Sequence, residues 1–551
     1  MPNRFLPYRV PRPVPSAQIL LLHLLVLASL SVAALWGWSL VSGEPIGESE
    51  KYILMASLYG AASAVFIFSR IQENRLTFFD IPVFLTILMF IEFGLAPLEC
   101  LVEPSQLDYR FGGSAGPLIE AFLCVATGMA AFWTGCSVKL TKGRGEQAGQ
   151  AGTGPPPVAR STMPVFEAAA ALYAVACGAK LYMLTHHLYY YLASENVLFS
   201  SLPYIEVLNA AAGFGTYALV IACIESYARP ADRKWKLFFA VVFASECFWG
   251  LISGMKAFLF QNFLIVALIS SVLQRRFRKG WIIATVVGLI TFYPLSNAYR
   301  AVIVGQGKQV TSLAAAVEVG AQALTTTGNG ASGPLAELKS GWLNTVHRVD
   351  NLQSMGLVIS LGARATQLTG RERMWMLPFY PFIPRFIWPS KPTLFEGRRF
   401  SVLLGYGTSV ETAGTSTAVT YPGDLYVRGG LSGIIVGMLL LGIAAQWLTN
   451  SVAGALDKRR LFIYASIFFR ATDMEVDAFG FWSNIIRAIA ILSVVAWLIY
   501  GPQRPWTSLE NPKLRRRHYA GGPQFRNEPL QTGDLILLQT HDQSPELGPK
   551  A

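Results

Sequence analysis

The chain has 551 residues, of which 52% are hydrophobic and 14% are charged, and its mean hydropathy is +0.40. Soluble domains carry roughly 25% charged residues, so this composition excludes an ordinary soluble protein and indicates a surface that lies largely in lipid. The formal net charge of +12 falls in short segments between apolar runs, with no nucleic-acid-binding motif. We therefore interpret the charge as a topology signal and expect no nucleic-acid partner.

A membrane-spanning helix needs about 20 mostly apolar residues. Runs of this kind predict an all-α polytopic membrane protein with about twelve transmembrane helices. In chain order the predicted spans are Ala17–Val41, Tyr52–Phe68, Phe79–Leu101, Pro117–Val138, Pro164–Met183, Pro203–Ile224, Leu237–Ile252, Ala257–Leu273, Trp281–Leu295, Gly430–Leu448, Leu461–Ala478 and Phe481–Tyr500. The eleventh run is interrupted by four charged residues, so a short or tilted element is the alternative there.

Basic residues follow the alternation of the predicted spans. With the N-terminus in the cytoplasm, the loops on that side carry most of the Lys and Arg residues: Arg70, Arg75, Lys139, Lys142, Arg144, Arg160, Arg229, Arg233, Lys234, Lys236, Arg275, Arg276, Arg278, Lys279, Lys458, Arg459 and Arg460. This asymmetry is the positive-inside pattern. It predicts that both termini are cytoplasmic.

The spans divide the chain into four parts. Residues 1–298 hold the first nine spans and a flexible cytoplasmic linker at 142–161, and residues 299–428 form one large loop that faces away from the cytoplasm. Residues 429–500 hold the last three spans, and residues 501–551 form a cytoplasmic tail whose composition predicts poor order.

The large outward loop is 130 residues long. Loops of this length are usually functional or disordered, and the many aromatic residues of this one indicate a folded cap at the membrane interface. Apolar residues at helical spacing predict at least one helix between Leu343 and Leu361.

Four clusters in this loop carry cationic residues: Arg300, Arg348, Arg385 with Lys391, and Arg398 with Arg399. Arginine binds phosphate oxygens in a bidentate manner and stays charged in a low-dielectric site. These residues therefore favour a site for the diphosphate of a lipid-linked substrate. Interfacial snorkelling or an ordinary salt bridge is the alternative for each arginine taken alone.

Candidate general bases in the loop include His347, Asp350, Glu372, Glu396, Glu411 and Asp424. His347 titrates near neutral pH, although a lone loop histidine is more often structural. No H-E-x-x-H, D-x-D, G-x-S-x-G or P-loop motif occurs, so the sequence predicts neither a metal nor a cofactor.

Ionisable residues also fall inside or beside the predicted spans. Glu246 lies near the outer end of the seventh span and Lys256 follows it in a tight turn, while Arg487 lies within the last span. Arg470, Asp473 and Asp477 are spaced to share one face of a helix. Ionisable residues within a membrane are costly, so they usually either serve a function or pair with one another.

Four short segments occur in a fixed order relative to the spans. They are Ser253-Gly254-Met255-Lys256, Asn297-Ala298-Tyr299-Arg300, His347-Arg348-Val349-Asp350 and the string Ile383-Pro384-Arg385-Phe386-Ile387-Trp388-Pro389-Ser390-Lys391-Pro392. Together with Thr415–Tyr426 before Gly429-Gly430, this order resembles the O-antigen and oligosaccharide repeat-unit polymerases (Wzy-like) of bacterial envelopes. The resemblance covers about residues 245–445.

The resemblance implies a GT-C-like glycosyltransferase of the bacterial inner membrane, in which the large loop is periplasmic. It would move a growing glycan from undecaprenyl pyrophosphate to a lipid-linked repeat unit. Contacts to the substrate would come from Lys256, Arg300, Arg348, Arg385, Lys391 and Arg470, and His347 or Asp350 would accept the hydroxyl proton. Membrane lipid and a chain-length regulator are the expected partners.

Two other functions remain open. An O-antigen-type ligase also needs a large outward loop with arginines. A non-enzymatic transporter of lipid-linked glycans needs charge spread across the spans, whereas the charge here gathers toward the outer face.

Overall fold

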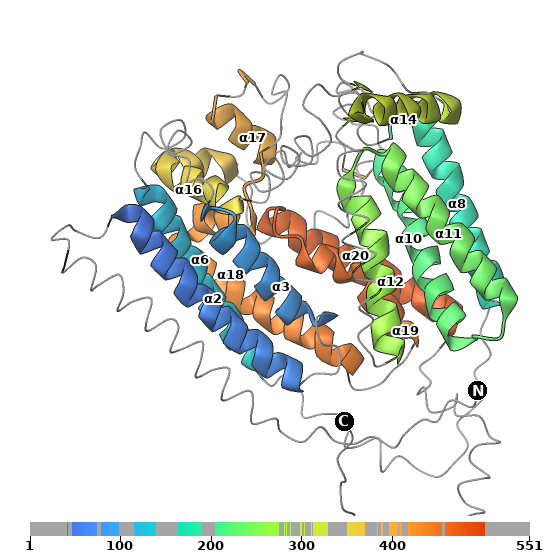
Figure 1. The fold of residues 1–551 in the computed structure, drawn as a ribbon, viewed down its shortest axis with the longest axis horizontal. Helices are drawn as coiled ribbons and strands as arrows, with labels where there is room; N and C mark the ends of the chain where they lie inside the picture. The colour runs from blue at the N-terminus through green and yellow to red at the C-terminus, as the bar shows by residue number, and fades with distance from the viewer. Residues whose placement is uncertain are drawn as a thin grey trace, which may run out of the picture. The chain divides into compact units, whose positions relative to one another are not determined.

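The computed structural model describes residues 47–73, 79–98, 115–138, 164–189, 204–274, 312–328, 350–369, 396–405, 407–409, 417–453 and 458–501, with isolated positions at 41, 280, 283, 287, 298–299, 302–303, 310, 383 and 387–388. Over these residues the secondary structure is helical and no strand occurs. The all-α prediction is therefore confirmed for the part of the chain that is described (Figure 1).

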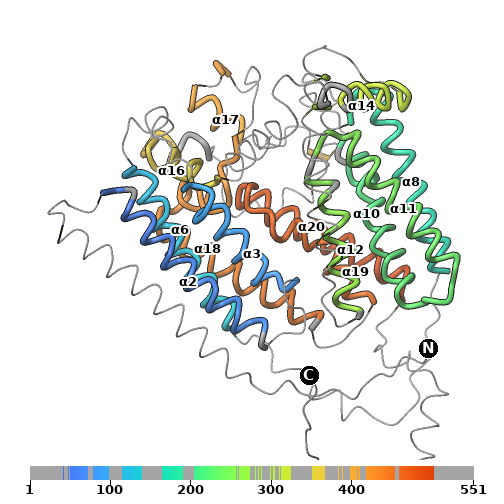
Figure 2. Tube along the Cα trace, in the orientation of Figure 1, coloured from blue at the N-terminus to red at the C-terminus, as the bar shows by residue number. Residues whose placement is uncertain are grey.

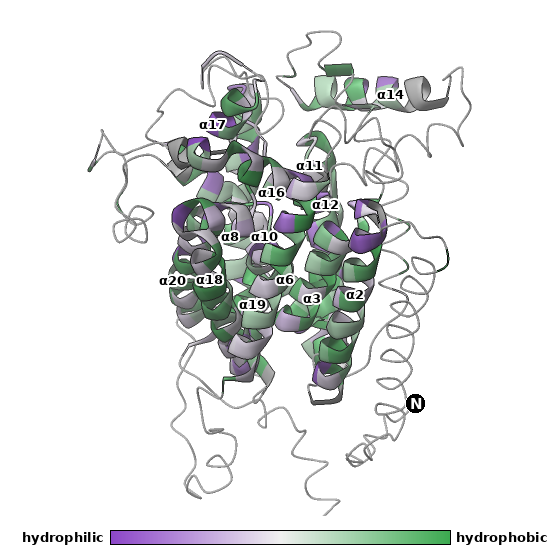
Figure 3. Cartoon of the chain, turned by 90° about the vertical axis from the view of Figure 1, so that its left-hand side faces the viewer, coloured by the Kyte–Doolittle hydropathy of each residue, from purple (hydrophilic) through white to green (hydrophobic). Residues whose placement is uncertain are grey.

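Seven helices of the described part are long and apolar enough to cross a membrane, which is consistent with a membrane protein. They are α2 (Glu48–Glu73), α6 (Gly116–Ser137), α8 (Val165–Thr185), α10 (Ile205–Ala228), α11 (Arg233–Ile252), α18 (Tyr421–Ala453) and α20 (Ala478–Tyr500). Each coincides with one of the predicted spans, and apolar residues extend along them in Figure 3.

The total of twelve spans stays a prediction. The first and ninth predicted spans lie outside the described residues, apart from isolated positions. The third is present as α3 (Ile81–Phe90) continued by the π-helix η2 (Ile91–Leu95), and the eighth as α12 (Lys256–Gln274). Only shorter apolar stretches were found in these two segments.

The eleventh predicted span is a short element, which agrees with the alternative given for it. Its helix, α19 (Lys458–Phe468), has only 11 residues and is followed by a short 3-10 turn, η6 (Arg470–Thr472). Asp473 then has extended backbone, and Asp477 is the N-cap of α20. Arg470, Asp473 and Asp477 therefore do not share a helix face. Arg470 lies in the 3-10 turn, whereas Asp473 and Asp477 lie beyond its end.

The described helices pack in two groups that α19 and α20 connect. α18 packs against α6 and α3, and α2 packs against α3 and α6. In the second group α10 lies beside α8, α11 and α12 (Figure 2). α19 contacts helices of both groups, and α20 contacts α18, α19 and α8.

Hydrogen bonds fix which helix ends lie together. The start of α2 meets the start of α6, because the Ala115 N–H donates to Glu48 Oε2 at 2.7 Å. The end of the α3–η2 segment lies at the same level, because the Tyr52 hydroxyl donates to the carbonyl of Phe93 at 2.9 Å. We call this the outward end, after the predicted topology, and the opposite one the inward end.

A chain reversal shapes the first part of α18. Gly429 and Gly430 have non-helical backbone angles, and Gly430 has a φ of 58°, which glycine adopts without strain. Residues before the kink lie against residues after it: the Tyr421 hydroxyl donates to the Gly437 carbonyl at 3.3 Å, and Leu425 packs on Gly433 and Gly437. The segment Tyr421–Arg428 is thus a half-helix that folds back along the span.

Described parts of the predicted loop 299–428 form two separate apolar clusters. α14 (Leu313–Gly328) belongs to a cluster with the ends of α8 and α11. The helices α16 (Asn351–Leu361), η4 (Gly362–Thr369) and α17 (Glu396–Leu403) form another around Val358 and Phe400. The helix predicted between Leu343 and Leu361 is confirmed from Asn351 onward.

Candidate functional site

The N-terminus of α16 carries a compact group of buried polar residues. Asp350 is the N-cap, and its carboxylate accepts from the Gln353 N–H at 3.2 Å and from Gln353 Nε2 at 2.6 Å. Asp350 and Gln353 are 5% and 2% exposed. A side chain that satisfies the free N–H groups of the first turn is a usual reason for aspartate at this position. Asp350 therefore stabilises the start of this helix.

Asn351, the next residue, connects α16 to η2. Its Nδ2 donates to Glu92 Oε2 at 2.9 Å, and both side chains are buried. Burying a carboxylate is costly unless hydrogen bonds compensate it, so Asn351 fixes the position of Glu92. The carboxylate is consequently held at the outward end of the bundle, within a segment that is otherwise apolar.

The half-helix of α18 brings a second carboxylate to the same region. Asp424 is 1% exposed, and it accepts from Arg428 Nε at 2.7 Å and from the Ala478 N–H at 3.1 Å. The Tyr421 N–H donates to the carbonyl of Met474 at 2.9 Å. These bonds join the start of α18 to the start of α20. Arg428 is ion-paired within this group.

Backbone strain marks the residue that opens the half-helix. Thr420 has a φ of 69°, and a β-branched residue in this region is a true outlier. Its Oγ1 accepts from the Gly423 N–H at 3.2 Å. Residues held in such conformations cluster at functional sites, where surrounding contacts compensate the strain.

The connection between α19 and α20 supplies three more acidic residues. Asp473 Oδ1 accepts from the Glu475 N–H at 3.3 Å, and Asp477 Oδ1 accepts from the Gly480 N–H at 2.6 Å. Burial raises the pKa of Asp473 and of Asp477 above the usual range, and these backbone hydrogen bonds only partly oppose it. Both carboxyl groups thus hold their protons to a higher pH than a solvated aspartate.

Together these residues form what we call the carboxylate cluster: Glu92, Asp424, Asp473, Glu475 and Asp477. Glu475 and Asp473 lie near enough to Glu92 to interact with it electrostatically, and Asp477 lies near enough to Asp424. Three segments that are remote in sequence contribute to it: η2, the start of α18 and the connection between α19 and α20. Within the described residues, no group of three or more His, Cys, Asp or Glu side chains has a metal-binding arrangement.

Most of the predicted site residues lie outside the described part of the chain: Arg300, His347, Arg348, Arg385 and Lys391. Lys256 begins α12, and only its backbone is described. Asp350 lies at the end of α16 that holds Glu92, while Arg470 is exposed on η6, close in sequence to Asp473. The predicted diphosphate contacts therefore stay predictions.

Sequence reasoning missed Glu92 as a candidate. The available signal was its position inside the third predicted span, since an ionisable residue in such a span is a functional hypothesis by default. Asn351 carried no such signal. An amide next to a helix cap is common, and the partner of this one lies 259 positions away.

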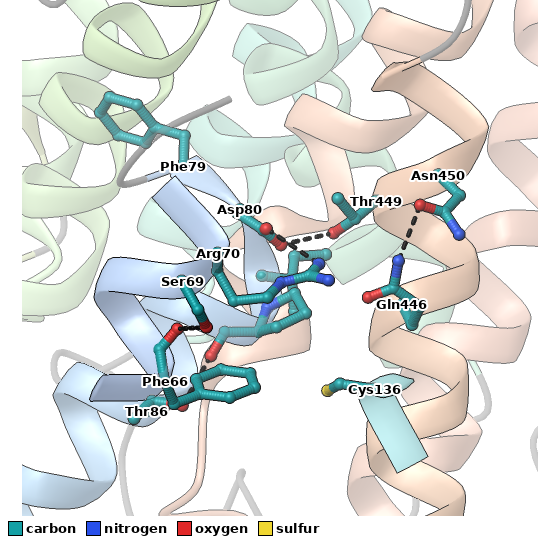
Figure 4. Close-up of polar contacts among 12 residues, drawn as sticks. Phe66, Ser69, Arg70, Phe79, Asp80, Thr86, Cys136, Gln446, Thr449 and Asn450 are labelled. Atoms are coloured by element: carbon teal, nitrogen blue, oxygen red, sulfur yellow. Dashed lines mark hydrogen bonds and ion pairs between the residues drawn. The ribbon is translucent and has the colours of Figure 1, made fainter. Parts of the chain in front are cut away.

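A second polar cluster lies at the inward end (Figure 4). Asp80 Oδ2 accepts from Arg70 Nη2 at 3.1 Å, and its Oδ1 accepts from Thr449 Oγ1 at 3.0 Å. Although Asp80 is the N-cap of α3, its side chain makes no cap hydrogen bond. Tyr464 instead accepts from the Ile81 N–H at 3.2 Å and donates to the Phe79 carbonyl at 2.7 Å. This cluster joins α2, α3, α18 and α19.

The predicted intramembrane Glu246 has a partner in the second helix group. Lys180 Nζ lies 2.6 Å from Glu246 Oε1, and both side chains are 6% exposed. Gly215 of α10 makes room for the pair, because a Cβ there would collide with Glu246 and Lys180. Mutual pairing therefore explains this charge within the span.

Comparisons with known proteins give one match. A family model described as "Domain of unknown function (DUF8712)" matches residues 179–468, which is slightly more than half of the chain. No curated protein and no solved structure matches the chain.

Proposed function

This chain belongs to the DUF8712 family, and we propose that it is a membrane glycosyltransferase that polymerises lipid-linked oligosaccharide repeat units. The donor would be a glycan on undecaprenyl pyrophosphate, and the acceptor a sugar hydroxyl of a second lipid-linked unit. Transfer takes place at the outer face of the bacterial inner membrane. The resemblance of residues 245–445 to O-antigen polymerases supports this substrate class.

One observation carries the proposal: the carboxylate cluster gathers at the end of the helices from which the large loop emerges. Glycosyl transfer from a diphosphate needs a general base for the acceptor hydroxyl. A carboxylate held by a neutral amide, as Asn351 holds Glu92, is suited to that role. The geometry supports Glu92 as the base more directly than Asp350, whose oxygens accept from Gln353.

The proposed reaction balances as a single substitution. The acceptor oxygen forms a bond to the anomeric carbon of the donor while the bond from that carbon to the diphosphate oxygen breaks. Glu92 takes the hydroxyl proton and later releases it to water. The diphosphate leaves with the electron pair, and cationic groups stabilise its charge.

We assign the diphosphate to the cations of the loop and not to the carboxylate cluster, because like charges repel it there. Arg300, Arg348 and Arg385 bind it in this proposal, and Lys256, Lys391 and Arg470 assist. His347 is the alternative base. In this assignment the acceptor binds on the side of the carboxylate cluster, and the donor diphosphate binds on the side of the loop cations.

Deletion of the gene with profiling of the cell-surface glycan tests the function. Loss of long chains with persistence of single repeat units is the expected result. Accumulation of lipid-linked chains of normal length would identify a ligase instead. Trapping of repeat units on the inner leaflet would identify a transporter.

Two loop variants test the donor side separately. Arg348→Ala and Arg385→Ala should each abolish chain growth while membrane abundance is unchanged. Normal chain growth in both variants would overturn the diphosphate assignment without affecting the assignment of Glu92.

A further inference from the structure

α14 runs across the direction of the candidate spans. In Figures 1 and 3, which are related by a quarter turn, the helix lies crosswise to the long helices near their outward ends. Ala316, Val319 and Ala323 are buried in one apolar cluster with Met183 and Leu184 of α8 and Trp249 and Ile252 of α11. The depth of α14 is thereby fixed at the level where these spans end.

The rest of α14 has two different flanks. Leu313 and Val317, one turn apart, are 38% and 56% exposed. On the other flank Gln322 Nε2 donates to Glu318 Oε1 at 3.2 Å. The buried face, an apolar flank and a polar flank thus follow one another around the helix.

The apolar flank lies at the level of the outward lipid-facing surface. Near the same ends of the spans, Leu181 and Tyr182 of α8 and Phe248 of α11 are exposed, by 40%, 42% and 39%. Exposed apolar side chains at the ends of candidate spans face lipid. Leu313 and Val317 lie at the same level, where water is the less favourable neighbour.

We propose that α14 is an interfacial helix that lies in the outer surface of the membrane, with Leu313 and Val317 inserted at the boundary of headgroups and acyl chains. Glu318, which is exposed, and Gln322, which is partly buried, lie on the flank that faces water. A helix with one apolar and one polar flank lies in this plane and does not cross it. The consequence is that the adjoining part of the large loop is anchored to lipid at the height of the carboxylate cluster.

Fluorescence of a site-specific label tests the proposal on the full-length chain. The variant Val317→Cys is labelled with the polarity-sensitive NBD group. The matched control is Gln322→Cys, which lies one turn and one residue further along the helix and carries the same label. Both are placed in nanodiscs of phosphatidylcholine and phosphatidylglycerol that contain a lipid with a nitroxide near its headgroup. The unmodified chain, labelled in parallel, measures reaction of the native cysteines.

NBD at position 317 should emit at shorter wavelength and be quenched by the nitroxide lipid at least about twofold more than NBD at position 322. Leu313→Cys should repeat the result and serves as an independent reading if Val317→Cys fails to fold. Equal quenching at 317 and 322, or no quenching at 313 and 317, overturns the proposal. The measurement uses no glycan substrate, so its outcome is separate from that of the glycosyltransferase proposal.

Discussion

Asn351 Nδ2 lies 2.9 Å from Glu92 Oε2 and joins two residues that are 259 positions apart in the chain. The contact holds a buried carboxylate at the outward end of α3–η2 with a neutral donor. A cation at this place would form an ion pair with the carboxyl group, whereas the neutral amide orients that group without an ion pair.

Glu92→Gln should reduce chain growth by at least about 100-fold, which is the lower range for loss of a general base. Glutamine still accepts a hydrogen bond from Asn351, so folding and membrane abundance should be unchanged. Glu120→Gln makes the same chemical change at an exposed position of α6 and should leave activity intact. The measurement is glycan polymerisation by membranes that contain equal amounts of each variant; full activity of Glu92→Gln would exclude Glu92 as the base.

Asp473→Asn should stabilise the protein at neutral and alkaline pH. The folded state raises the pKa of Asp473 through burial, so the folded state binds this proton more tightly than the unfolded state. The contribution of Asp473 to stability is then greatest at low pH and is lost as the pH rises through the folded pKa. Asparagine cannot ionise and still accepts from the Glu475 N–H.

The check is the melting temperature of Asp473→Asn minus that of the parent, measured from about pH 4 to about pH 8. This difference should grow with pH. A difference for Asp473→Asn that shrinks with pH would contradict the direction of its pKa shift.

Lys180→Met should destabilise the second helix group by about 3–5 kcal/mol, because it leaves Glu246 buried without its partner. The double variant Lys180→Met with Glu246→Leu should recover most of that loss, since no unpaired charge remains. Unfolding of the purified protein in mixed micelles measures both. If the double variant is as unstable as the single one, the attraction between Lys180 and Glu246 exceeds the free energy that it costs to bury both charges.

Gly442→Ala should destabilise the contact of α6 with α18, since a Cβ at position 442 would collide with the Phe132 carbonyl. The matched control is Gly178→Ala in α8, where nothing lies within 4 Å of the added Cβ; there alanine should be neutral or slightly stabilising. Thermal unfolding of the two variants tests this. Equal melting temperatures would mean that the two helices separate at little cost.

Apolar run length was sufficient to predict most of the described helices. Where a span is continuous, as in α6 and α10, the helix lies within a few residues of its predicted position. The reason is physical: in lipid the backbone must satisfy its own hydrogen bonds, so a long apolar segment has few alternatives to a helix.

The prediction failed where distant residues supply the hydrogen bonds. The helix ends at Phe468, before the charged residues of the eleventh predicted span. Beyond it, the Met474 carbonyl accepts from the Tyr421 N–H and the Ala478 N–H donates to Asp424 of α18. No local pattern contains such partners. Asp424, Asp473 and Asp477 were visible in the sequence as candidates, and Glu92 could have been found from its position inside a predicted span. The hydrogen bond from Asn351 to Glu92 could not be predicted, because it joins residues 259 positions apart.

The half-helix Tyr421–Arg428 has a consequence for the order in which the protein is made. Its first N–H and its carboxylate bind Met474 and Ala478, and Ala478 is synthesised 54 residues after Asp424. During translation the contacts of Tyr421–Arg428 with Gly433 and Gly437 can form within α18, but its bonds to Met474 and Ala478 form only after those residues have been made. A chain that ends before α20 therefore lacks these partners for the half-helix, and the carboxylate cluster is among the last parts of the protein to be completed.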